Sequence, residues 1–250
     1  MYPHRIRLRG PWECEPFARI IRHADGRMEE THQDLPPRST MTMPCRWSDG
    51  GLADFAGRVR CRRRFGMPRR IDDFERVWLT CEGVAESAVF WLNAHLLGQQ
   101  ETATAPFEFE VTALLRERND LVIEVTAPEG NGGLREVALE VRCAVFLRNV
   151  QLSATFSGKR TRLHAAGEIV GKVEQPLDLY LILGRHTVGY QTICKEDTSF
   201  AIDSEELTPE QLGSLDGQLP RFHDVRVELV NGAVSWYTFQ QGFEFRDLGT

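Results

Sequence analysis

The segment from Val77 to Leu115 constrains the fold of this chain more than any other part of the sequence. In residues 77–82, Val, Leu and Cys occupy one set of alternate positions and Trp, Thr and Glu the other, and the same period of two recurs in residues 88–93. This period is typical of β-strands, because successive side chains of a strand point to opposite faces. Asn93 then begins a tight turn into a third strand. The segment therefore predicts β-hairpins rather than helices.

The rest of the chain continues the strand pattern. Residues 177–183 and 225–229 alternate in the same way, and short helical turns are indicated only at Thr112–Leu115 and Thr208–Leu212, each after a threonine cap. A chain of 250 residues is long enough for two domains of ordinary size. We predict an all-β protein with domains at residues 1–142 and 143–250.

Short motifs follow one another in a fixed order along the chain. In the first domain they are Arg5–Trp12, Met43–Trp47, Gly57–Phe65, Gly83-Val84, Phe90–Asn93, Gly98, Pro106–Thr112, Asn119–Val125 and Gly132–Val137. In the second they are Arg148–Leu152, Val225–Leu229 and Gly242–Leu248. This order resembles the family-two glycoside hydrolases, the β-galactosidases, β-glucuronidases and β-mannosidases. The resemblance implies a galactose-binding-like, sugar-binding jelly-roll β-sandwich followed by an immunoglobulin-like β-sandwich.

The chain departs from the family pattern at several positions. Ala94 stands where the family has a turn glycine, Glu110 where it has Asp, and Arg60 and Cys61 replace two aromatic residues. Both central residues of a two-residue hairpin turn need a positive φ, so Ala94 either costs about 1 kcal/mol or changes the turn type.

The resemblance does not extend to catalysis. Retaining glycosidases need two carboxyl groups about 5 Å apart, and in this family both lie on a (β/α)₈ barrel of roughly 250 residues that follows the sandwiches. We find neither such a segment nor the Asn-Glu dipeptide that carries the acid/base in the family. We therefore expect no catalytic residue and no enzyme activity from this chain on its own.

Sugar recognition would combine aromatic stacking with hydrogen bonds to hydroxyl groups. The aromatic candidates are Trp47, Trp91 and Trp236, and the polar candidates are Asp49, Asn93 and Glu101. Thr102 occupies the position at which β-galactosidases place a carboxylate that reaches their substrate. Trp91 could instead be a core residue, because its strand is apolar on both faces. Trp47 borders the polar turn Ser48–Gly51, and this position is compatible with either an exposed or a buried side chain.

Three functions follow from these observations. The first is a stand-alone carbohydrate-binding protein. The second is an interaction module that docks onto another protein, such as a separately encoded barrel, or onto itself as a homo-oligomer. The third is a glycosidase that acts through assembly with a barrel-bearing chain. An exposed apolar patch would favour the second.

Composition argues against several other classes. A net charge of −6 disfavours nucleic-acid binding, and the basic run Arg58–Arg64 is predicted to be a solvated sheet face. No apolar stretch reaches the ~20 residues of a membrane span and no signal-peptide pattern occurs, so a cytoplasmic location without membrane contact is expected. The six dispersed cysteines favour free thiols over disulfides. Metal-site motifs are absent and no cofactor is expected, although the turn from Asp49 to Asp54 allows a structural calcium.

Overall fold

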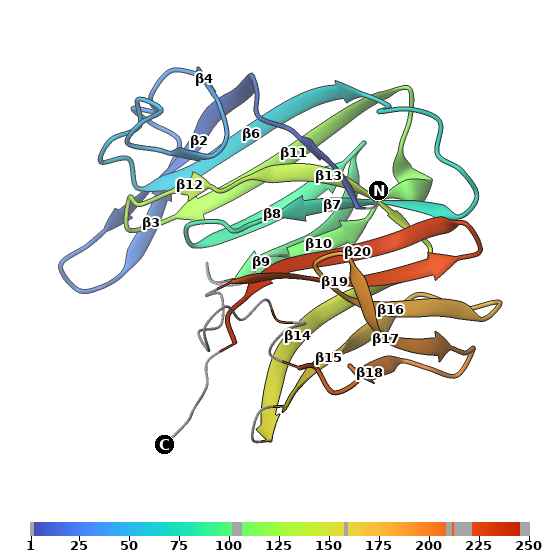
Figure 1. Cartoon of the computed structure of the whole chain (residues 1–250). Helices are drawn as coiled ribbons and strands as arrows, with labels where there is room; N and C mark the ends of the chain where they lie inside the picture. Colours follow the sequence, from blue (N-terminus) through green and yellow to red (C-terminus); the bar gives the residue numbers. More distant parts are fainter. Residues whose placement is uncertain (1–2, 102–106, 158–159, 209–211, 213–221, 246–250) are drawn as a thin grey trace. The chain divides into compact units, whose positions relative to one another are not determined.

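The computed structural model of the protein describes residues 3–101, 107–157, 160–208, 212 and 222–245 (Figure 1). The chain divides into two compact units, Arg5–Val141 and Arg142–Thr250, the second of which includes Met1–His4. Among the described residues there is no α-helix, and the short 3-10 helix η1 (Thr112–Leu114) lies within the turn predicted after residue 111. The predicted all-β class is confirmed. The helical turn predicted at 208–212 lies mostly outside the described residues.

The first unit, which we call the jelly-roll unit, is built from two main sheets. The four-stranded sheet has the order β1 (His4–Arg7), β13 (Val137–Cys143), β7 (Glu75–Cys81), β10 (Phe107–Glu110). The larger sheet has the order β3 (Met28–Thr31), β2 (Trp12–Arg22), β6 (Gly57–Gly66), β11 (Arg118–Ala127), β8 (Ser87–Leu92), β9 (His95–Glu101), with β4 (Ser39–Met41) also paired to β2. A small separate sheet pairs β5 (Cys45–Arg46) with β12 (Gly133–Leu134).

The core of the jelly-roll unit fills the space between these sheets. Strand β8 buries Ala88, Phe90 and Leu92 and leaves the alternate positions partly exposed, as the period of two predicts. The Phe90 ring meets Phe107 of the opposite sheet edge to face, with 4.3 Å between ring centroids. This alternation fixes which face of β8 is available to solvent.

The β8–β9 hairpin keeps its tight turn despite the missing glycine. Asn93 and Ala94 have φ values of 52° and 67°, so both central residues adopt the left-handed conformation that such a turn requires. The Asn93 side chain fixes the turn: its Nδ2 donates to the carbonyl of Leu114 at 2.7 Å, and its Oδ1 accepts from the amide of Asp120 at 2.9 Å. Of the two outcomes expected for Ala94, the structure shows the strained residue rather than a new turn type.

The second unit is also a two-sheet sandwich. One sheet has the order β14 (Phe146–Ser157), β15 (Arg160–Val170), β18 (Ser199–Asp203). The other has the order β17 (His186–Ile193), β16 (Leu177–Leu183), β19 (His223–Asn231), β20 (Val234–Phe243). Its core includes Leu179, Leu181 and Val227, and Trp236 packs half-buried against it. Trp236 is therefore part of the support of this sandwich.

Candidate functional site

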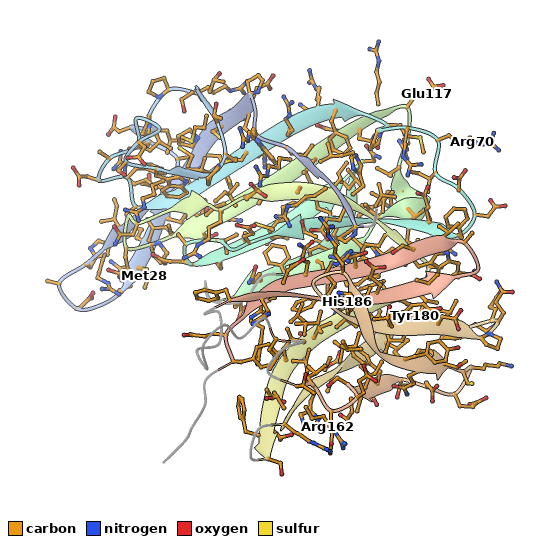
Figure 2. All side chains as sticks on the ribbon, in the orientation of Figure 1. Met28, Arg70, Glu117, Arg162, Tyr180 and His186 are labelled. Atoms are coloured by element: carbon orange, nitrogen blue, oxygen red, sulfur yellow. The ribbon has the colours of Figure 1, made fainter. Side chains whose placement is uncertain are left out.

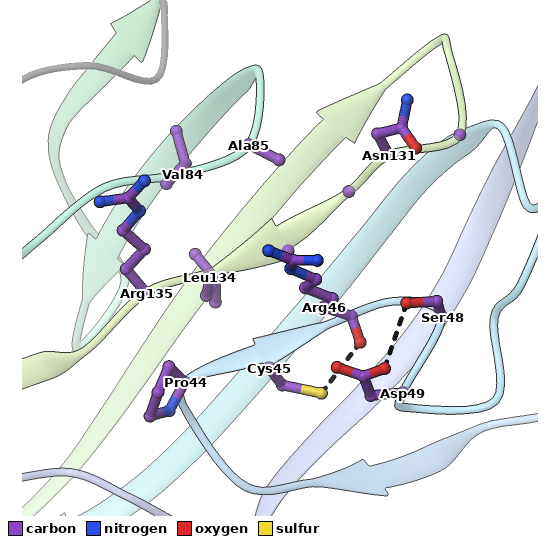
Figure 3. Close-up of a pocket in the computed structure, with 13 residues that line it drawn as sticks. Pro44, Cys45, Arg46, Ser48, Asp49, Val84, Ala85, Asn131, Leu134 and Arg135 are labelled. Carbon is purple, nitrogen blue, oxygen red and sulfur yellow. Dashed lines mark hydrogen bonds between the residues drawn. The ribbon is translucent and has the colours of Figure 1, made fainter.

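A hollow of about 780 Å³ opens among the loops of the jelly-roll unit (Figure 3). We call it the loop hollow. Its volume is within the range of small-molecule sites. The described residues that line it are Pro44, Cys45, Arg46, Ser48, Asp49, Val84, Ala85, Gly130, Asn131, Gly132, Gly133, Leu134 and Arg135.

Three short chain segments form the base of the loop hollow. Arg46 of β5 pairs with Gly133 of β12, and the amide of Trp47 donates to the carbonyl of Gly132 at 2.9 Å. On the other side of β12, Val84 bridges to Leu134, and the Arg135 amide donates to the carbonyl of Gly83 at 2.9 Å. Backbone hydrogen bonds thus hold residues 44–47, 132–135 and 83–85 next to one another.

Two glycines are needed for this close approach. A Cβ atom on Gly132 would lie 2.1 Å from the Trp47 ring, and one on Gly133 would lie 2.8 Å from the carbonyl oxygen of Cys45. Gly130, by contrast, has a φ of +82°, and a Cβ there would make only ordinary contacts of 3.8–3.9 Å, so this glycine turns the chain. Gly130 therefore turns the chain, whereas Gly132 and Gly133 allow the close approach of backbone and ring.

Trp47 lies in the core below the loop hollow. Its side chain is 1% exposed, and its ring packs against Phe55 at 5.8 Å between centroids and against Gly132. A buried ring has no free face for a sugar, so the stacking role predicted for Trp47 does not fit its position. Its role is to shape the floor of the loop hollow from within.

The walls of the loop hollow carry exposed polar groups. Arg46 and Arg135 bring two guanidinium groups, and neither makes an ion pair with any other described residue. Asp49 supplies a carboxylate, whose Oδ1 accepts a hydrogen bond from Ser48 Oγ at 3.3 Å, and Asn131 supplies an amide. Hydrogen-bond donors and acceptors therefore converge in one open space.

The surroundings of the Cys45 thiol, at the edge of the loop hollow, favour its protonated form. Burial raises the pKa of Cys45, and the negative charge of Asp49 raises it further, because both disfavour a thiolate. The thiol donates to the carbonyl oxygen of Arg46 at 3.1 Å. These effects favour the neutral thiol over the thiolate that a nucleophilic cysteine needs.

The arginines of β6 differ from those of the loop hollow. Arg60 pairs with Glu124 at 2.7 Å and Arg62 with Asp120 at 2.6 Å across the β6–β11 ladder. Arg58 and Arg60 also lie over the Phe17 ring, at 4.8 and 4.9 Å from its centroid. The basic run in the sequence therefore forms an ion-paired sheet face.

Trp91 and Glu101 lie on that outer face of the larger sheet. Trp91 is half-buried and pairs with Val122 on one side and with Leu96 on the other; Leu96 is 65% exposed. Glu101 ends β9, and its carboxylate accepts from the Gln99 amide at 2.7 Å. Neither residue lines the loop hollow, and the amide of Asn93 is occupied by the turn described above.

The structure thus separates the residues predicted to form a sugar site. Asp49 lines the loop hollow, Trp47 lies beneath it, Trp91 and Glu101 share the outer sheet face, and Asn93 holds a turn. Thr102 lies outside the described residues. Arg46, Asn131 and Arg135 were not among the residues selected from the sequence. A signal was nevertheless present, because glycine-rich loops allow close backbone approach: Arg46 pairs with Gly133, and Arg135 follows that glycine by two residues.

Within the described part of the chain no group of three His, Cys, Asp or Glu side chains is arranged to hold a metal ion. The described residues likewise contain no helix with the length and apolar character needed to cross a membrane.

Comparison with known proteins identifies the fold. No family model and no curated protein sequence matches the chain. Among solved structures, an FMN-binding β-glucuronidase from Facaelibacterium prausnitzii L2-6 has a TM-score of 0.70 and 15% identity, over 96% of this chain and 39% of that one. A Bifidobacterium dentium β-glucuronidase complexed with coumarin-3-O-glucuronide has a TM-score of 0.69 and 18% identity, over 98% and 49%. A Bacteroides uniformis β-glucuronidase 2 variant has a TM-score of 0.72 and 15% identity, over 97% and 32%.

These similarities cover nearly all of this chain but less than half of each enzyme. At such low identity the likeness concerns the fold alone. The two sandwiches have the fold of the β-sandwich part of family-two glycosidases, so the predicted resemblance and fold class are confirmed.

Proposed function

We propose that the jelly-roll unit binds a carbohydrate in the loop hollow. The observation that carries this proposal is the convergence of Arg46, Asp49, Asn131 and Arg135 in one open space of suitable volume. The shared fold with β-sandwiches of glycosidases supports a sugar over other small molecules. The role is binding rather than hydrolysis, because Asp49 is the one carboxylate among the described lining residues and a retaining glycosidase needs two.

Recognition in the loop hollow would rest on hydrogen bonds. No aromatic side chain occurs among the described residues that line it, and the nearest tryptophan, Trp47, is buried. The Asn131 amide and the Asp49 carboxylate offer both donors and acceptors to sugar hydroxyl groups. Ala85 and Pro44 supply small apolar surfaces for the C–H groups of a pyranose ring.

Isothermal titration calorimetry with a panel of neutral and acidic mono- and oligosaccharides tests the proposal. We expect saturable binding of at least one sugar, and about tenfold weaker binding in Asn131→Ala, which loses hydrogen bonds of roughly 1.5 kcal/mol. Gln99→Ala is the matched control, because it removes an exposed amide from the outer sheet face instead. If binding were lost in Gln99→Ala or Trp91→Ala but kept in Asn131→Ala, the sugar would bind to the outer sheet face and not in the loop hollow. No binding across the panel would refute the proposal.

A second candidate function is protein docking through the outer sheet face. Leu96 lies on β9, an edge strand of the larger sheet, and is 65% exposed beside the half-buried Trp91 of β8. Exposed apolar side chains next to an unpaired strand edge favour association with a second copy or with another protein, such as a barrel-bearing chain. Light scattering after size-exclusion chromatography would show a dimer that Leu96→Glu dissociates, and a monomer at all concentrations would exclude self-association.

A further inference from the structure

Resting on the proposed carbohydrate site, we infer that its ligand is an anionic saccharide whose charged group is held jointly by Arg46 and Arg135. The shared chemistry is an oxyanion attached to a pyranose ring, either the carboxylate of a uronic acid or a sulfate ester. Asn131, Ser48 and Asp49 remain for the hydroxyl groups of the same ring.

Local backbone pairing brings the two arginines together. Arg46 lies opposite Gly133, and Arg135 follows Gly133 by two residues. Residues two apart along an extended segment point to the same face, and diagonal neighbours across a strand pair are about 7–8 Å apart, within reach of long side chains. In the view of Figure 3 the two side chains lie on either side of Leu134. Because Gly133 has no side chain, nothing from that position separates them.

The charges of the two arginines are not compensated by the protein. Many other arginines of the jelly-roll unit are paired with carboxylates: Arg5, for example, contacts Glu82, Glu136 and Glu140 at 2.6–2.8 Å. Arg46 and Arg135 form no such pair with any described residue. Among the described lining residues the formal charge is +1, two arginines minus Asp49, in a chain whose net charge is −6.

This arrangement favours an anion over a neutral sugar. A ligand that enters the loop hollow removes water from both guanidinium groups, and a neutral ring leaves part of that lost hydration unreplaced. Carboxylate and sulfate oxygens restore it with charge-assisted hydrogen bonds, for which the planar fork of arginine is well shaped.

Calorimetric titration with matched pairs of sugars tests the inference. The pairs are the methyl glycosides of glucuronic acid and glucose, those of galacturonic acid and galactose, and 6-sulfated N-acetylglucosamine with its unsulfated form. We expect at least one acidic member to bind about tenfold or more tightly than its neutral partner, with an advantage that decreases as salt is added. A preference for the carboxylate pairs or for the sulfate pair identifies the source of the anion, and either supports the inference.

Single substitutions then assign the preference to the two arginines. Arg46→Gln and Arg135→Gln should each weaken binding of the acidic sugar by about tenfold and change binding of its neutral partner by less than about twofold. Arg70→Gln is the matched control, because Arg70 projects from the loop between β6 and β7 and does not line the loop hollow (Figure 2). Unfolding curves of all three variants would check that the fold is retained.

The negative outcomes are distinguishable. Equal binding of acidic and neutral partners, or an acidic preference that survives both substitutions, would overturn the inference and leave the carbohydrate proposal standing. No binding of any sugar would refute the carbohydrate proposal, and the inference with it.

Discussion

The β8–β9 hairpin and the loop hollow belong to the same unit but use their polar residues in opposite ways. In the hairpin, the side chain of Asn93 bonds to the backbone at Leu114 and Asp120, so its hydrogen-bonding groups hold the fold. In the loop hollow, Arg46 and Arg135 have no ionic partner among the described residues. The hairpin carries the more recognisable motif, yet the less conspicuous loop carries the groups available to a ligand. Polar groups that bond within the protein hold the fold, whereas exposed polar groups that line an open space can contact a ligand.

The largest effect is expected where the scaffold and the loop hollow meet. Gly132→Ala places a methyl group 2.1 Å from the Trp47 ring, which is held between Gly132 and Phe55 in the core. Overpacking of this kind should lower the free energy of unfolding of the jelly-roll unit by about 3 kcal/mol and also weaken sugar binding. Urea denaturation followed by tryptophan fluorescence measures the first effect and calorimetry the second.

Gly66→Ala is the control for the glycine substitution itself. A Cβ at Gly66 would meet only the Glu117 carbonyl oxygen at 3.7 Å, an ordinary contact. The free energy of unfolding of Gly66→Ala should stay within about 0.5 kcal/mol of that of the parent protein. If Gly132→Ala behaved like Gly66→Ala, the close packing of the loop on Trp47 would be refuted.

The next prediction compares an asparagine-to-alanine substitution in the β8–β9 hairpin with the same substitution in the loop hollow. Asn93→Ala removes the side-chain bonds to Leu114 and Asp120 and leaves alanine at a φ of 52°, so it should cost about 2 kcal/mol of stability. Asn131→Ala, in the exposed wall of the loop hollow, should change stability by less than about 0.5 kcal/mol. Thermal unfolding monitored by circular dichroism, together with sugar titration, gives both readouts. A reversed pattern, in which Asn93→Ala abolishes binding at unchanged stability, would contradict the division of roles.

The sequence predicted the fold well because strand periodicity and turn chemistry are local. Residues 88–92 point alternately to the core and to solvent as the period of two requires, and Asn93 adopts the expected turn. The loop hollow is harder to predict from the sequence, because it depends on contacts between residues far apart in the chain. Whether Trp47 is exposed depends on Gly132, 85 positions later in the chain, and no local pattern records that contact.

The same limit applies to the candidate site residues. The chemistry of Trp91 and Glu101 suits sugar recognition as that of Asp49 does, but the strand register places Trp91 and Glu101 on the outer sheet face. The pairing of Arg46 with Gly133 is what brings Arg46 near Arg135, and pairing between segments almost 90 residues apart cannot be read from periodicity. The sequence indicates which residue types could bind a sugar, and tertiary contacts decide which of them meet.

A smaller effect tests the strain stored in the hairpin. Ala94 has a φ of 67°, which disfavours a side chain with a Cβ, so Ala94→Gly should raise the free energy of unfolding by up to about 1 kcal/mol without affecting sugar binding. The urea midpoint should rise at an unchanged m-value. Ala166→Gly, at an exposed position in strand β15, is the control and should lower stability by roughly 0.5 kcal/mol. A loss of stability in Ala94→Gly would mean that the turn does not strain this residue.

The smallest effect concerns the carboxylates next to the loop hollow. Burial raises the pKa of Glu86, and the nearby charge of Glu129 raises it further, whereas a hydrogen bond with the backbone of Glu129 lowers it. The folded state therefore favours protonated Glu86. This contribution to stability is complete below the ordinary carboxyl pKa and is lost as the pH rises through the raised value. Glu86→Gln should match the parent protein at low pH and exceed it in stability at neutral pH, by less than about 0.5 kcal/mol because Glu86 is only partly buried and solvent screens its charge. Urea unfolding from acidic to neutral pH measures the difference, with Glu117→Gln as the control for loss of a surface charge (Figure 2).

If the stability difference between Glu86→Gln and the parent protein instead grew toward acidic pH, the pKa of Glu86 would be lowered and not raised by folding. The region next to the loop hollow would then hold this carboxylate in the charged form.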